Sequence, residues 1–211
     1  MGGEKILVSK EELVEASKHL HYEIEMIRKN LQTLRSIEAN HNSPVRFVKY
    51  SFVESFLVHA RNLYDFLFRV GPRTRFAEDD IRAGDFLGNE IWEKPPISSD
   101  LEKWYTTMIN KRLVHLTYHR LYIEEFEQQW QVGTMYAELE RALLSFYRKV
   151  NPENLCGALQ EERQFALERA ARPRTKSQAM EQEAVTNYAT GTASESPPFF
   201  FGQGQDQGNQ T

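Results

Sequence analysis

The chain has 211 residues, 40% hydrophobic and 27% charged, which is enough apolar material for one medium-sized core. With 26 Lys and Arg against 30 Asp and Glu, the formal net charge is -4, which argues against a global electrostatic attraction to nucleic acid or anionic lipid. The single cysteine, Cys156, excludes an internal disulfide framework and a Cys-rich zinc module. No run approaches the roughly 18 apolar residues of a membrane span, so we expect a cytoplasmic protein without membrane contact.

The first predicted helix covers about residues 10–39. It follows Ser9-Lys10-Glu11-Glu12, in which the Ser hydroxyl and a Glu three positions later can satisfy free amides at a helix start. Its apolar residues form a stripe along one side of the helix, and charged residues such as Arg28 and Arg35 lie outside this stripe. Residues of that stripe recur in steps of three and four: Leu13, Ala16, Leu20, Ile24, Ile27, Leu31, Leu34 and Ile37.

A second helix is predicted over about residues 44–70. Ser43-Pro44 offers an N-cap and a proline at the first helical position, and Gly71-Pro72 ends the pattern. Apolar residues cover more than one face, so this helix should lie centrally. Residues 73–99 form a long connection, in which Asp79-Asp80 could cap a short turn of helix.

Three further helical segments complete the predicted fold. Ser99-Asp100-Leu101-Glu102 has the form of a second capping box and starts a helix that runs to about Trp130. Thr134 is the expected cap of a fourth helix, which Asn151-Pro152 stops, and a fifth amphipathic stretch ends near Arg172. We therefore expect an all-α, up-and-down bundle of four long helices plus a shorter fifth.

The composition divides the chain into residues 1–8 as a flexible N-terminus, 9–172 as the helical domain and 173–211 as a disordered polar tail. The tail contains three consecutive aromatic residues within 197–202, which could dock onto a partner, fold back onto the bundle or have no role. The 13 Phe, 9 Tyr and 3 Trp exceed what a narrow bundle buries easily, which predicts a homo-oligomer, most simply a homodimer.

The third helix concentrates polar groups that could carry chemistry. Lys111, His115 and His119 are four residues apart and share one side of a helix, and Arg112 aligns with His119 seven residues on. A cation that holds a phosphate oxygen beside an imidazole that moves a proton is what metal-free phosphoryl chemistry on RNA needs.

This segment resembles the HEPN superfamily of helical bundles, in which an Arg precedes a His on the third main helix. Arg112 and His119 have the family's spacing, although Leu113 stands where a polar residue often follows the Arg. The other registration, Ile109-Asn110 with His115, keeps the Asn but has Ile in the place of the Arg. The resemblance covers roughly residues 44–150 and implies a dimeric, metal-independent ribonuclease that needs no cofactor. It implies Arg112, His115 and His119 as catalytic residues, and Asn110, Lys111 and Arg61 as substrate-binding residues.

The same histidines also support a second resemblance. His115-Leu116-Thr117-Tyr118-His119-Arg120 is similar to the His-x-x-x-His-Arg segment of DinB-type four-helix metal bundles, with Leu121-Tyr122 in place of that family's Gly-Gln. His59 would then be the third metal ligand beside His115 and His119. A third interpretation gives the chain no site at all: the histidines pack in the core or form an oligomer face of a purely structural interaction bundle.

Arg61 has two interpretations as well. It lies four residues before Asp65, a spacing typical of an intrahelical ion pair. Alternatively, it approaches the polar patch of the third helix. Our leading hypothesis is a HEPN-like interaction or dimerisation module with an RNA-directed site on that helix.

Overall fold

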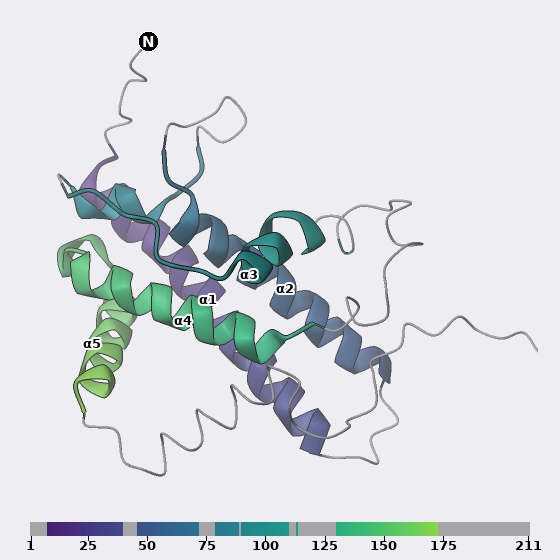
Figure 1. Ribbon diagram of the computed structural model, residues 1–211. Helices are drawn as coiled ribbons and strands as arrows, with labels where there is room; N and C mark the ends of the chain where they lie inside the picture. Colours follow the sequence, from purple (N-terminus) through teal and green to yellow (C-terminus); the bar gives the residue numbers. More distant parts are fainter. Residues whose placement is uncertain are drawn as a thin grey trace, which may run out of the picture.

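The computed structural model describes residues 8–39, 46–71, 79–88, 90–109, 113 and 130–172. Within these ranges every regular element is helical, which confirms the expected all-α bundle (Figure 1). The N-terminal residues 1–7 and the predicted tail, 173–211, lie outside the described residues. The elements are α1 (Lys10–Ala39), α2 (Arg46–Phe68), η1 (Ala83–Leu87), α3 (Ser99–Lys103), η2 (Trp104–Met108), α4 (Val132–Lys149), η6 (Pro152–Asn154) and α5 (Gly157–Ala171).

Helix α1 forms as its sequence predicts. The Ser9 amide donates to Glu12 Oε2 at 2.8 Å, and the Glu12 amide donates to Ser9 Oγ at 3.1 Å, so the predicted capping box is confirmed. The predicted stripe is the buried face of the helix, with only Ala16 and Ile37 partly exposed. The buried members are Leu13, Leu20, Ile24, Ile27, Leu31 and Leu34.

Helix α2 packs antiparallel to α1 and also contacts α4, which makes it central as expected. Two polar contacts cross the α1–α2 seam: Asn30 donates to Ser55 Oγ at 2.9 Å, and His59 Nδ1 lies 2.7 Å from Glu23 Oε2. Gly71 follows the helix with a φ of 96°, a conformation that residues with a Cβ rarely adopt.

The connection after α2 closes one end of the core. Trp92 donates its indole N–H to the Leu67 carbonyl at 2.7 Å, and Phe86 packs edge-on against Phe146 of α4. The short helix expected here forms at Ala83–Leu87, but Asp79-Asp80 does not cap it. Asp85, its third residue, accepts the Arg82 amide instead, while Asp80 pairs with Arg69.

The third helix begins one residue earlier than the capping box predicts. Ser98, not Ser99, is the N-cap and accepts the Leu101 amide at 3.4 Å. The predicted box does not form, because Ser99 is the first helical residue and not the cap, and the Glu102 carboxylate pairs with Lys94. Beyond η2, a π-helical turn, most of the predicted helix lies outside the described residues.

Helix α4 also starts earlier than predicted. Gln131 is its N-cap, so Thr134 lies inside the first turn, and its buried Oγ1 has no hydrogen-bond partner in the described part of the chain. Gly133 also lies in this first turn, where the amides have no intrahelical partner. The stop at Asn151-Pro152 is confirmed, because α4 ends at Lys149.

Helix α5 matches the predicted fifth segment and returns along α4 and α1 (Figure 1). Its start is tied to α1 by the fully buried Ser17, whose hydroxyl accepts the Cys156 amide at 2.7 Å and donates to the Val14 carbonyl at 2.7 Å. Leu159 is its one fully buried side chain. Ala166 and Leu167 are partly buried against the core, and polar contacts that border the candidate site complete the docking of α5.

Candidate functional site: a groove between α1 and α4

The catalytic and binding residues predicted on the third helix are not among those that the structure describes. Asn110, Lys111, Arg112, His115 and His119 all lie outside the described residues. The HEPN-like and DinB-like sites therefore stay predictions.

The two predicted site residues on α2 serve separate contacts. Arg61 Nε lies 3.9 Å from Asp65 Oδ2, which confirms the intrahelical ion pair. His59 holds Glu23 of α1, with the Tyr22 ring edge-on at 5.6 Å. Residues two positions apart on a helix do not face each other, so α2 does not bring His59 and Arg61 together.

A metal centre has no support within the described ranges. No group of three or more His, Cys, Asp or Glu side chains there could hold a metal ion. Of the predicted ligand set only His59 is described, and its Nδ1 is engaged by a carboxylate.

A polar cluster that sequence reasoning missed joins α1, α4 and α5. Glu162 of α5 lies at its centre, with a side chain only 12% exposed. Its Oε1 accepts the Tyr147 hydroxyl at 2.6 Å and pairs with Arg28 Nη2 at 3.0 Å, while its Oε2 lies 3.8 Å from His21 Nε2. This one largely buried carboxylate thus links α5 to both α1 and α4.

The cluster continues toward the C-terminal end of α5. Arg28 Nε donates to the Tyr136 hydroxyl at 3.4 Å, and that hydroxyl donates to Glu140 Oε1 at 3.2 Å. Arg169 of α5 pairs with the same Glu140 oxygen at 2.5 Å. Helix α5 therefore contacts both residues that hydrogen-bond the Tyr136 hydroxyl, Arg28 and Glu140.

The protonation states within the cluster follow from burial and neighbouring charge. Burial, then the Glu162 carboxylate, raises the pKa of Tyr147 above its usual value, and burial with Glu140 raises that of Tyr136. Burial opposes the charge of Arg28, but Glu162 and the Tyr136 hydroxyl outweigh it and raise the pKa of Arg28. At neutral pH both tyrosines are neutral and Arg28 is a cation.

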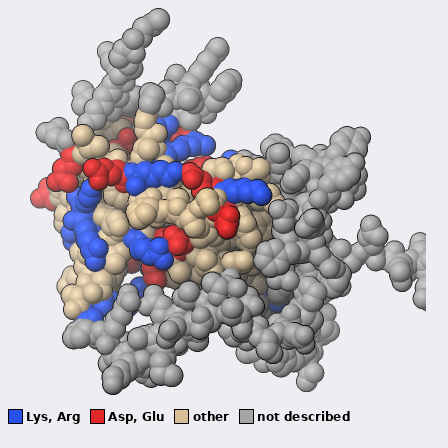
Figure 2. Space-filling model, viewed as in Figure 1, with Lys and Arg blue, Asp and Glu red and all other residues tan. Residues whose placement is uncertain are grey.

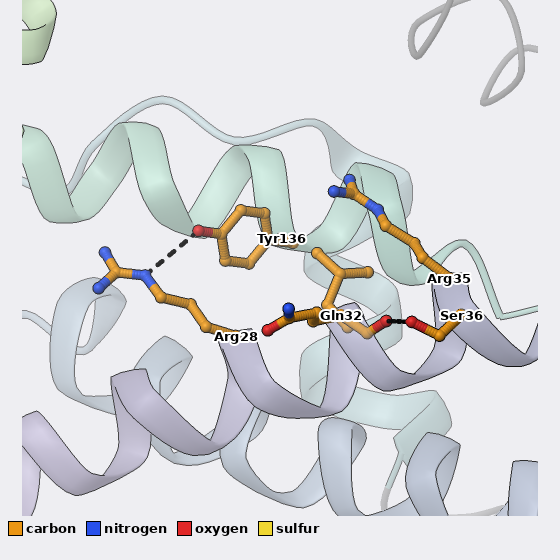
Figure 3. A pocket seen from close by; sticks show the side chains of 6 residues that line it. Arg28, Gln32, Arg35, Ser36 and Tyr136 are labelled. Carbon is orange, nitrogen blue, oxygen red and sulfur yellow. Dashed lines mark hydrogen bonds between the residues drawn. The ribbon is translucent and has the colours of Figure 1, made fainter.

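Beside this cluster an open groove of about 390 Å³ lies between α1 and α4. Figure 3 shows the Arg28 and Arg35 guanidinium groups toward opposite ends of it, with the Tyr136 ring between them. The other lining residues all come from α1: Leu31, Gln32 and Ser36.

The groove has an unbalanced positive charge at one end. Arg35 is exposed and forms no ion pair with the described residues, whereas Arg28 is paired with Glu162. The described residues that line the groove include no carboxylate. Elsewhere the charges are mixed: on the face seen in Figure 2, acidic and basic side chains alternate and form no large patch of one sign.

The sequence matches no family model, and no curated protein or solved structure is significantly similar to the chain. Within the described residues, no helix has the length and apolarity needed to cross a membrane.

Proposed function

We propose that the bundle is a binding module that accepts a small organic phosphate in the groove between α1 and α4. The observation that carries this proposal is the lining of the groove: two arginines, an amide and an aromatic ring, with no carboxylate among the described residues. The volume of about 390 Å³ falls in the range of small-molecule sites.

The chemistry of the lining selects the ligand class. Arg35 presents a guanidinium fork, and Arg28 retains Nη1, which has no contact of this kind with the described residues. Forked donors match the several acceptor oxygens of a phosphate, and charge-assisted hydrogen bonds are the strong ones. The Tyr136 ring and Leu31 add apolar surface for the organic part of the ligand.

Calorimetric titration with phenyl phosphate tests the proposal, because this probe combines a phosphate with one aromatic ring. We expect a Kd of about 0.1–1 mM, typical of a ligand of this size. Arg35→Gln removes a charge-assisted contact worth about 1.5–3 kcal/mol, so the affinity should fall at least tenfold.

The matched control is Arg148→Gln. Arg148 is also exposed, lies on α4 and does not line the groove, yet its substitution changes the net charge equally. An equal loss in both variants, or no binding to the unaltered chain, contradicts the proposal.

A further inference from the structure

We infer that Glu162 of α5 is an internal competitor for the anionic ligand, so that binding in the groove and docking of α5 oppose each other. The inference rests on the proposed function and adds its regulation. It starts from one geometric fact: Arg28 both lines the groove and pairs with Glu162 at 3.0 Å.

Competition follows because the free Nη1 alone does not form a fork: a two-nitrogen contact with a phosphate also needs Nη2, which holds Glu162. A carboxylate and a phosphate oxygen are equivalent partners for an arginine fork. When a ligand draws Arg28 toward the groove, Glu162 loses its strongest cationic partner. The groups that remain around it are the Tyr147 hydroxyl at 2.6 Å and His21 at 3.8 Å.

Loss of the Arg28–Glu162 pair should weaken the docking of α5, because this helix buries little apolar surface. Its inward face carries one fully buried apolar side chain, Leu159, while its large aromatic residue, Phe165, is 70% exposed. Ala166 and Leu167 are only partly buried against the core, and polar contacts to α4 add to them: Arg163 Nε donates to the Tyr147 carbonyl at 2.7 Å, and Arg169 pairs with Glu140. A helix held in this way opens at a lower free energy than the core.

The coupling must be reciprocal. If docked α5 weakens ligand binding by some factor, bound ligand weakens α5 docking by the same factor. Both halves of this relation are measurable.

The first measurement is titration of Glu162→Gln with phenyl phosphate. The neutral amide weakens the hold on Arg28, and we expect the affinity to rise about five- to tenfold, the lower end of such couplings. Glu161→Gln is the control: its residue is the exposed neighbour on α5, it carries the same charge change and it does not line the groove. Its affinity should stay within about twofold of the unaltered chain, a bound that follows from screening at the surface.

The second measurement needs no substitution and therefore holds even if Glu162→Gln fails to fold. Amide hydrogen exchange is followed in the unaltered chain with and without saturating phenyl phosphate. We expect the amides of α5 to exchange several-fold faster with the ligand, while those in the middle of α1 do not change.

The outcomes separate this inference from the proposed function. If the unaltered chain binds and Arg35→Gln does not, but Glu162→Gln binds no better and α5 exchange does not rise, the proposed site stands and the competition is overturned. If the unaltered chain does not bind the probe, both fall.

Discussion

The contact between α1 and α2 depends mainly on apolar burial, whereas the contact of α5 with the bundle depends more on polar interactions. Across the α1–α2 seam, buried aliphatic residues run from Leu13 to Leu34, beside polar contacts such as Asn30 with Ser55 and His59 with Glu23. At the α5 contact the balance differs: Leu159 is the one fully buried side chain of α5, Ala166 and Leu167 are partly buried against the core, and ion pairs and hydrogen bonds centred on Glu162 join them.

The two contacts therefore have different consequences: one sets the stability of the bundle, and the other can respond to a ligand. Apolar burial is non-directional and is not screened by salt, so it sets the global stability of the bundle. Polar docking depends on distance, charge and solvent, which makes α5 the element that a ligand can influence. The groove lies beside this adjustable region, and Arg28 belongs to both.

The largest expected effect is on the apolar side of the comparison. Ile27 is 1% exposed in the middle of α1, so Ile27→Ala should lower the free energy of unfolding by about 2–5 kcal/mol. Urea denaturation followed by circular dichroism measures it. A loss below about 1 kcal/mol contradicts the assignment of this seam as the core.

A smaller and more local effect is expected on the polar side. Glu162→Gln should cost about 1–3 kcal/mol, because hydrogen bonds to a charged group are weakened rather than removed. Hydrogen exchange should show protection lost in α5 before α1. Equal loss of protection in both helices would mean that α5 is part of the same cooperative unit.

Alkaline pH tests the buried tyrosines of the junction. The pKa of Tyr147 is raised in the fold, so above pH 10 the unfolded chain releases a proton that the folded chain keeps, and stability falls as the pH rises. One such group contributes a slope of about 1.4 kcal/mol per pH unit. Tyr147→Phe should therefore flatten the decline between pH 10 and 11, and an unchanged slope contradicts the burial of this hydroxyl.

The smallest effect belongs to the exposed pair of Arg169 and Glu140. Arg169→Ala should cost about 0.2–1 kcal/mol at low ionic strength, and this cost should vanish in about 1 M salt. Thermal unfolding at two salt concentrations measures it. A cost that persists at high salt would show that Arg169 contributes by packing instead of charge.

The sequence predicted the features of the fold that depend on local chemistry. The start of α1 followed from Ser9 and Glu12, two residues that cap one another, and its buried face followed from the spacing of its aliphatic residues. The start of the third helix differs by one residue from the prediction, because Ser98 and Ser99 are adjacent and either serine can cap a helix.

The candidate site could not be predicted because its parts are distant in sequence. Arg28, Gln32 and Arg35 have helical spacing that places them on one side of α1, and this signal is present in the sequence. Their partner Tyr136 lies 108 positions after Arg28, and nothing in local periodicity says which face of α4 meets α1. The histidines predicted on the third helix, His115 and His119, are only four residues apart, a spacing that local periodicity does detect.

The central claim concerns where an organic phosphate binds, and chemical-shift mapping on isotope-labelled protein tests it most directly. With phenyl phosphate added, we predict shifts of the Arg35 side-chain Nε and of the backbone amides of Gln32 and Tyr136. Shifts confined to residues 110–120, with none in the groove, would contradict the account and favour the site predicted on the third helix.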